Sequence, residues 1–318
     1  MKSTKLPLVI LTGPTAVGKT ALSISLAKAV GGEIISADSM QVYRRMDIGS
    51  AKITQEEMEG VPHHLIDVLL PDQEFNVVVF QELAKRAAAE IYSRGHIPIL
   101  VGGTGFYIQA LLYDIDFTQN DEDTQLRRSL EEQARREGAE ALYERLRAVD
   151  PESCESIHAH NIKRVIRAIE FYEKTGKKIS EHNREQRGND SPYNFAYFVL
   201  TDGREKIYQR INDRVDLMME RGLLEEVRAL RESGCRKDMV SMQGLGYKEL
   251  LSYLEGEISL DEAVYLIKRD TRHFAKRQLT WFRREKEVIW IDKTVFDQDS
   301  QKILRFMQDF LRERGIIL

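Results

Sequence analysis

The first candidate site is a phosphate-binding loop near the start of the chain. It fits the pattern G-x-x-x-x-G-K-[ST] and consists of Gly13, Pro14, Thr15, Ala16, Val17, Gly18, Lys19 and Thr20. Backbone N–H groups of such a loop and of the helix after it bind an anion, and Lys19 adds a positive charge between the terminal phosphates. Thr20 offers a hydroxyl to Mg²⁺, the cofactor that we expect. The loop predicts a di- or triphosphate ligand, but it does not say whether a phosphoryl group moves or a diphosphate leaves.

The segments around this loop are those that a phosphate loop requires. Leu8–Leu11 is an apolar run that predicts a buried parallel strand. Residues 21–29 have helical spacing, with Leu22, Leu26 and Ala29 on one face. Strand, loop and helix in this order favour a phosphate-binding loop over the alternative, a glycine-rich turn without a ligand.

A second polar loop follows the next predicted strand, residues 33–36. Ligands of an open parallel sheet bind outside the carboxyl ends of the strands, so Asp38 is expected in the same crevice as the phosphate loop. Asp38 is a candidate general base or outer ligand of Mg²⁺, or equally a side chain that caps the following turn. Asp47 and Lys52 come soon after, and they are either site residues or ordinary surface charges.

A third loop, Gly102-Gly103-Thr104-Gly105, follows a predicted strand at residues 97–101. Its glycines allow positive φ and close approach of the backbone, and Thr104 presents a hydroxyl at the crevice. The alternative is a plain strand-to-helix turn. The strand does not end in the acidic residue of a Walker B element, which argues against an ATPase motor or an enzyme that activates water for hydrolysis.

One arginine lies where packing alone would not put it. Residues 204–221 predict a helix with an apolar stripe that contains Ile207, Ile211 and Met218. Arg214 falls within that stripe, where a charge is costly unless it is paired or faces a ligand. It is therefore expected either to pair with a core carboxylate or to reach a bound phosphate.

Two predicted helices carry basic surfaces. Helix 261–286 places Arg269, Arg272, Lys276 and Arg283 on one face. Its other face is lined by Val264, Thr271, Ala275, Gln278, Leu279 and Phe282. Helix 161–174 adds Lys163, Arg164 and Arg167. Such stripes suit the phosphate backbone of RNA, although most charged helix faces are merely solvated.

The order of predicted elements divides the chain. Strands and helices alternate over the first hundred residues, and strand character returns at 196–200 and 287–291, which predicts an α/β fold with a parallel sheet flanked by helices. The highly charged stretch between predicts helices alone, at 123–137, 139–148 and 161–174. We therefore expect a phosphate-loop core of residues 1–118 and 191–318, interrupted by a helical insertion of residues 119–190. The alternative is one continuous domain with long surface helices.

Composition bounds the class of protein. The chain has 318 residues, of which 42% are hydrophobic and 31% charged, as in globular proteins large enough for more than one domain. A net charge of −4 gives no overall attraction to nucleic acid. Two cysteines are too few for a zinc cluster or a disulfide framework, so a reducing compartment is expected. The apolar start is too short for a signal peptide or a membrane span, which predicts a cytoplasmic protein.

Taken together, these motifs resemble the tRNA dimethylallyltransferase (tRNA isopentenyltransferase) family over nearly the whole chain. The phosphate loop is common to many families, whereas the ordered set of the other segments is specific. Those segments are 38–43, 47–52, 62–65, 102–107, 164–170, 244–247 and 271–281. Ser50 and Ile53 stand where the family often has Thr and Pro. With two cysteines the chain cannot carry the zinc finger of eukaryotic members, so it resembles the bacterial form.

The resemblance implies a reaction and a fold. A dimethylallyl group would pass from dimethylallyl diphosphate to N6 of the adenosine immediately 3′ of the anticodon in tRNA, and diphosphate would leave. The fold would be a P-loop kinase-like core with a helical insertion that binds the anticodon stem-loop. The expected partners are tRNA and dimethylallyl diphosphate, with no membrane, and a monomer is expected.

The resemblance also implies roles for single residues. Asp38 would be the base near N6, Thr104 would contact the adenine or the diphosphate region, and Arg214 would hold the diphosphate together with Lys19, Thr20 and Mg²⁺. The implied tRNA contacts are Asp38, Ser39, Met40, Gln41, Thr104, Lys163, Arg164, Arg167, Arg272, Lys276 and Arg277.

Two other classes of protein share part of this pattern. A P-loop small-molecule or nucleotide kinase has the same loop and core, and the insertion would be its lid. A kinase consumes ATP, whereas a prenyltransferase releases diphosphate from an isoprenoid. An RNA-binding GTPase predicts hydrolysis and an Asn-Lys-x-Asp string, which the sequence lacks. We therefore favour the transferase.

Overall fold

The computed structural model describes residues 5–117, 124–187 and 189–318. The chain divides into two compact units, Met1–Leu111 with Pro192–Leu318, and Leu112–Ser191. The segment expected as an insertion, 119–190, falls within the second unit. Its first residues, up to 123, lie outside the described residues, and so does residue 188.

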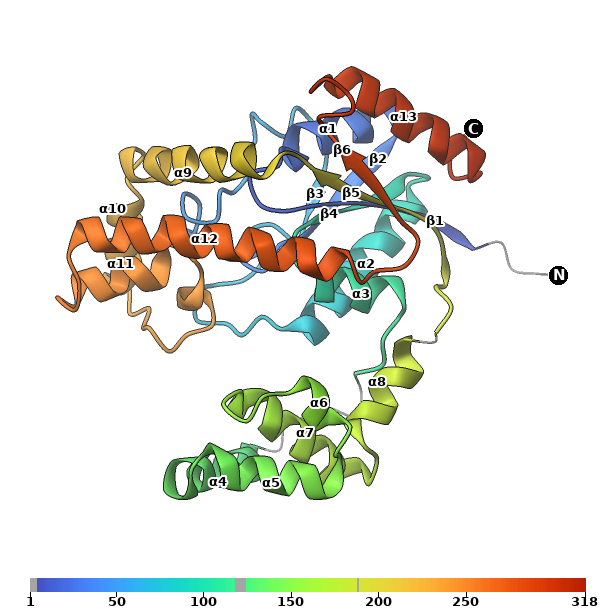
Figure 1. Ribbon diagram of the computed structural model, residues 1–318. Helices are drawn as coiled ribbons and strands as arrows, with labels where there is room; N and C mark the ends of the chain where they lie inside the picture. The colour runs from blue at the N-terminus through green and yellow to red at the C-terminus, as the bar shows by residue number, and fades with distance from the viewer. Residues whose placement is uncertain (1–4, 118–123, 188) are drawn as a thin grey trace. The chain divides into compact units, whose positions relative to one another are not determined.

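The first unit contains a six-stranded sheet with the order β3-β2-β4-β1-β5-β6 (Figure 1). Its strands are β1 (Leu6–Thr12), β2 (Gly32–Ala37), β3 (His63–His64), β4 (Ile97–Gly102), β5 (Tyr193–Thr201) and β6 (Val288–Asp292). Every neighbouring pair of these strands is parallel, as the alternation of elements predicted. The sequence did not reveal β3, because two residues are too few to show a periodicity.

Helices cover both faces of this sheet. The helices of this unit are α1 (Lys19–Val30), α2 (Val77–Ser93), α3 (Gly105–Leu112), α9 (Arg204–Glu220), α10 (Leu223–Glu232), α11 (Tyr247–Leu254), α12 (Leu260–Phe282) and α13 (Ser300–Glu313), with a 3₁₀ turn at Ser241–Gln243. Figure 1 shows α1 and α13 on one side of the sheet and α2 and α3 on the other. The buried side chains of Val9 and Leu11 pack with Leu26 of α1 and Met307 of α13. Helix α12 ends at Phe282, earlier than the expected residue 286.

The described residues of the second unit form helices joined by loops, with no strand among them. It consists of α4 (Thr124–Glu137), α5 (Ala139–Val149), α6 (Ser153–Ser156), α7 (Ile162–Thr175) and α8 (Ile179–Arg187). Its core contains Leu130, Leu142, Leu146, Val165, Ile166 and Ile169. The buried carboxylate of Asp150 joins α6 to α8, because it accepts hydrogen bonds from the hydroxyls of Ser153 and Ser180, both at 2.6 Å. None of the helices that the structure describes has the length and apolarity needed to cross a membrane.

Candidate active site

Three loops meet at the carboxyl ends of β1, β2 and β4. β4 lies between the other two strands, and its last residue, Gly102, pairs with both Thr12 and Ala37. The hydroxyl of Thr12 donates to the carbonyl of Gly102 at 2.7 Å, and the N–H of Thr104 donates to the carbonyl of Ala37 at 3.3 Å. The phosphate loop, the loop after Asp38 and the loop at 102–105 are therefore brought to one place, as a parallel sheet predicts.

The phosphate loop has a backbone that its glycines make possible. Gly13 has φ +147°, and a Cβ there would lie 2.3 Å from the carbonyl oxygen of Leu200, so a larger residue would collide with β5. Lys19 folds back over the loop, and its Nζ donates to the carbonyls of Gly13 (3.0 Å) and Pro14 (2.9 Å). Burial, aided by the charge of Arg214 and opposed by that of Asp38, lowers the pKa of Lys19 to about 8.

Arg214 reaches the phosphate loop from α9. Ile207, Ile211 and Val215 of this helix are buried, and Arg214 is half-buried beside them. Its Nη1 lies 3.5 Å from Oγ1 of Thr15. Burial lowers the pKa of Arg214, while the charge of Asp38 opposes the shift. Of the two expected placements, the hydrogen bond favours the phosphate loop over a carboxylate of the core.

Asp38 has one of the two roles that the sequence left open, the cap of the turn, while its role as a base stays a prediction. Its Oδ1 accepts hydrogen bonds from the N–H groups of Met40 (2.8 Å) and Gln41 (3.3 Å), so it does cap the turn. Burial raises the pKa of Asp38, and these two bonds and the charges of Lys19 and Arg214 oppose the rise. A carboxylate with a raised pKa beside two cations of a phosphate site has the electrostatics of a base.

The loop at 102–105 is shaped by close contact with α12. A Cβ on Gly103 would lie 2.1 Å from Nε2 of Gln278, and one on Gly105 would lie 2.2 Å from Cδ1 of Trp281. The absence of side chains at these two glycines thus allows α12 to pack closely against the loop that follows β4. Thr104 is half-buried at the start of α3, and its carbonyl accepts from the N–H of Tyr107 at 2.9 Å.

Two residues that the sequence analysis did not assign to the site join its loops. Gln278 is only 5% exposed, and its side chain contacts the backbone of both the phosphate loop and the loop at 102–105. Glu226 of α10 accepts from the N–H groups of Asp47 and Ile48, both at 2.8 Å, and from the hydroxyl of Tyr247 at 2.7 Å. Gln278 had one signal in the sequence, since a buried amide on an apolar helix face requires partners. The partners of Glu226 depend on the tertiary fold.

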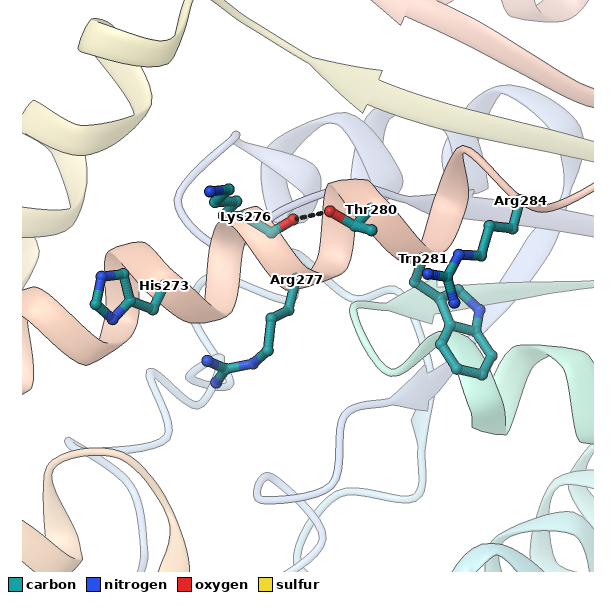
Figure 2. A pocket seen from close by; sticks show the side chains of 6 residues that line it. All are labelled: His273, Lys276, Arg277, Thr280, Trp281 and Arg284. Atoms are coloured by element: carbon teal, nitrogen blue, oxygen red, sulfur yellow. Dashed lines mark hydrogen bonds between the residues drawn. The ribbon is translucent and has the colours of Figure 1, made fainter. Parts of the chain in front are cut away.

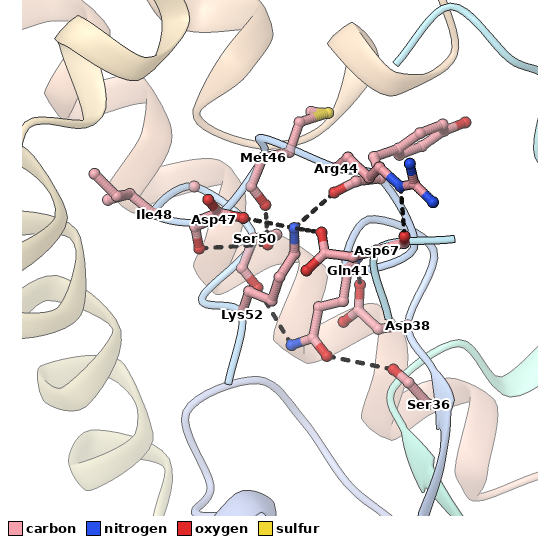
Figure 3. A network of polar contacts seen from close by, with 12 residues as sticks. Ser36, Asp38, Gln41, Arg44, Met46, Asp47, Ile48, Ser50, Lys52 and Asp67 are labelled. Carbon is pink, nitrogen blue, oxygen red and sulfur yellow. Dashed lines mark hydrogen bonds and ion pairs between the residues drawn. The ribbon is translucent and has the colours of Figure 1, made fainter. Parts of the chain in front are cut away.

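Lys52 is the centre of a polar network (Figure 3). Its side chain is 5% exposed, and Nζ donates to the carbonyl of Tyr43 and to the carboxylates of Asp47 and Asp67, each at 2.6 Å. The amide of Gln41 joins the network, because it donates to the carbonyl of Ala51 at 3.3 Å. Lys52 is therefore a buried scaffold residue, which corrects the alternative of an ordinary surface charge.

Side chains of α12 line a basic and aromatic pocket of about 370 Å³ (Figure 2). It is lined by His273, Lys276, Arg277, Thr280, Trp281 and Arg284. The indole of Trp281 meets the ring of Phe106 edge to face at 6.3 Å. Two members of the basic stripe expected on this helix already have protein partners. Arg269 pairs with Asp270, and Arg272 donates to Oδ1 of Asn212 at 2.6 Å.

The remaining predicted residues are placed as follows. Ser39, Met40 and Gln41 are half-buried in the loop after β2, and Thr20 is exposed in the first turn of α1. In the second unit, Lys163, Arg164 and Arg167 lie on the exposed face of α7. The part of the chain that the structure describes has no cluster of three or more His, Cys, Asp or Glu side chains suited to a metal ion.

A phosphate loop between the first strand and helix of an all-parallel sheet, with a lysine folded over it, defines a P-loop protein with a kinase-like α/β core. The family model described as IPP transferase matches residues 41–285 of this chain. The chain therefore belongs to the IPP transferase family, and its bacterial relatives are named as tRNA-modifying enzymes.

Two kinds of similarity support this membership. The tRNA dimethylallyltransferase of Lachnoclostridium phytofermentans is 63% identical over 98% of this chain and 99% of its own length. The solved tRNA isopentenylpyrophosphate transferase of Bacillus halodurans has a TM-score of 0.74 and 45% identity, and 98% of each chain is covered. A eukaryotic dimethylallyltransferase acting on tRNA has a TM-score of 0.83 and 31% identity, over 97% of this chain and 80% of its own.

Proposed function

We propose that this protein transfers a dimethylallyl group from dimethylallyl diphosphate to N6 of the adenosine 3′-adjacent to the anticodon in tRNA, releasing diphosphate. The observation that carries the proposal is a single arrangement. A half-buried carboxylate, Asp38, shares the loop region with two cations, Lys19 and Arg214, whose pKa values it influences. The names of the relatives support the same reaction.

The residues match the chemistry of such a transfer. The exocyclic nitrogen of adenine is a poor nucleophile, because its lone pair is delocalised into the ring. Asp38 would accept the N6 proton as nitrogen bonds to the allylic carbon. The carbon–oxygen bond to the diphosphate breaks in the same step, and negative charge develops on the leaving group. The loop N–H groups, Lys19 and Arg214 would stabilise that charge.

Mg²⁺ fits the phosphate site as an ion held largely by the substrate. Thr20 offers one hydroxyl oxygen in the first turn of α1, next to Lys19. Mg²⁺ prefers oxygen ligands and is often bound by one or two protein groups together with phosphates and water. When bound, it would supply positive charge to the diphosphate oxygens.

The acceptor adenosine must leave its stack to reach the crevice. We propose that Ser39, Met40, Gln41 and Thr104 contact the RNA at the crevice. On α12, Lys276 and Arg277 are exposed and would contact it directly, whereas Arg272 would do so by exchanging its bond to Asn212. Lys163, Arg164 and Arg167 would contribute contacts from the second unit. We also propose a cytoplasmic location, because the cysteines Cys154 and Cys235 are both free thiols, as in proteins of a reducing compartment.

Incubation with labelled dimethylallyl diphosphate and unmodified tRNA tests the proposal. Nucleoside mass analysis should find one dimethylallyl group on the adenosine next to the anticodon, with one diphosphate released per group. A tRNA with guanosine at that position is the matched control and should remain unmodified. Consumption of ATP without prenyl transfer would instead support the kinase and overturn the proposal.

A further inference from the structure

The side chain of Gln278 spans the distance between the phosphate loop and the loop at 102–105. Its Oε1 accepts from the N–H of Thr15 at 2.9 Å, and its Nε2 donates to the carbonyl of Gly103 at 3.0 Å. The oxygen faces a donor and the nitrogen faces an acceptor, so both ends of the amide are satisfied in one orientation. A buried amide of this kind fixes its partners, because losing either bond would leave a polar group unpaired.

The bond to Thr15 affects the part of the loop that holds phosphate. Thr15 is the third residue of the loop that runs from Gly13 to Thr20. A phosphate loop binds its anion through N–H groups that converge on it. The N–H of Thr15 is directed to Gln278 instead, and so it is withdrawn from that set.

Two cations lie at the same end of the loop. Nζ of Lys19 lies across the carbonyls of Gly13 and Pro14, and Nη1 of Arg214 lies 3.5 Å from the hydroxyl of Thr15. A longer anion that extended to this end of the loop would meet these cations but not a free backbone donor at Thr15. Gln278 occupies the backbone donor that Thr15 would otherwise offer.

We infer that Gln278 is a positioning residue that closes the phosphate loop at Thr15 and so makes the site selective for a diphosphate over a triphosphate. The inference rests on the proposed function, because it takes the diphosphate as the ligand. It also explains why Gly103 has no side chain, since a Cβ there would lie 2.1 Å from Nε2 and would displace the amide.

The test compares binding of inorganic diphosphate and inorganic tripolyphosphate by calorimetry at fixed Mg²⁺ concentration. Gln278→Met keeps the volume and net charge of the side chain and removes both hydrogen bonds. We expect its preference for diphosphate over tripolyphosphate to fall by about tenfold, the equivalent of one hydrogen bond to a charged group. Gln301→Met, at an exposed position of α13, is the matched control and should keep the preference of the parent protein.

A purely structural role would give a different result. If Gln278 only stabilises the fold, the variant would lower the thermal unfolding midpoint and weaken both anions equally, and the unchanged ratio would overturn the inference. Gln278→Ala removes the same bonds without new atoms. If the Met variant unfolds, the preference of the Ala variant for diphosphate over tripolyphosphate is measured instead. If the parent protein binds neither anion, the proposed function fails. If it prefers diphosphate and both Gln278 variants keep that preference, only the inference fails.

Discussion

The guanidinium of Arg214 lies 3.5 Å from the hydroxyl of Thr15, so α9 supplies a cation to a loop that lies 199 positions earlier in the chain. In the sequence, Arg214 stands out as a charge within an apolar stripe, and in the structure its side chain extends to the phosphate loop. The contact brings Arg214 to the same loop that Lys19 folds over, so the two cations lie at one phosphate loop.

Replacing Arg214 should weaken binding of the leaving group. We expect Arg214→Ala to raise the inhibition constant of inorganic diphosphate and to lower kcat/KM by about 10²–10³, the usual loss for one donor to a developing charge. The affinity for tRNA should hardly change. Arg221→Ala, at the exposed end of the same helix, is the control. Loss of tRNA affinity with normal diphosphate inhibition would contradict the assignment.

The pH dependence of diphosphate binding should report on Lys19. Its pKa is lowered to about 8 in the free protein, so the ammonium is present below that value and is lost as the pH rises through it. Inhibition by inorganic diphosphate should therefore weaken above pH 8. A Lys19→Arg variant has no titration in this range, and its profile should be flat there. Parent and variant profiles that fall together would exclude Lys19 as the cause.

Two substitutions of Asp38 should separate its chemical role from its structural one. Asp38→Asn keeps an oxygen that can accept from Met40 and Gln41 but removes the base, and we expect single-turnover transfer to slow by about 10²–10⁴ with little change in thermal stability. Asp38→Ala removes both roles and should also lower the unfolding midpoint. A rate near normal in the Asn variant would show that Asp38 only caps the turn.

Lys52 should prove to be a stability residue. Lys52→Met removes three hydrogen bonds from a side chain that is 5% exposed, and we expect a loss of about 1–3 kcal/mol in the free energy of unfolding. Lys28→Met removes an ion pair to Glu59 in which both side chains are about half exposed, and it should cost no more than about 1 kcal/mol. Chemical denaturation measures both, and equal losses would contradict the network's importance.

The sheet and its loops could be predicted from the sequence because their signals are local. Continuous apolar runs marked five of the strands, and the end of a parallel strand placed Asp38 beside the phosphate loop. The roles of Lys52 and Gln278 could not be derived in the same way. Each role depends on which backbone groups the fold brings within hydrogen-bonding distance. Gln278, for example, bonds to Thr15, which lies 263 positions earlier in the chain.

The basic surface of α12 also depends on tertiary contacts that the sequence does not show. Helical periodicity put Arg269, Arg272 and Lys276 on one face, but it could not show which of them already had partners. Arg269 pairs with Asp270 and Arg272 bonds to Asn212, whereas Lys276 and Arg277 are exposed beside the pocket. The tertiary partners therefore decide which charges a bound RNA can use.

The salt dependence of tRNA binding should separate these arginines and lysines. Removing one phosphate contact lowers the slope of log K against log salt by about 0.7–0.9. We expect that loss for each of Lys276→Gln and Arg277→Gln, and a smaller one for Arg269→Gln, because Asp270 already neutralises it. Lys302→Gln on α13, which pairs with Asp297, is the control. An unchanged slope in the first two variants would mean that this face of α12 is solvated and does not contact the RNA backbone.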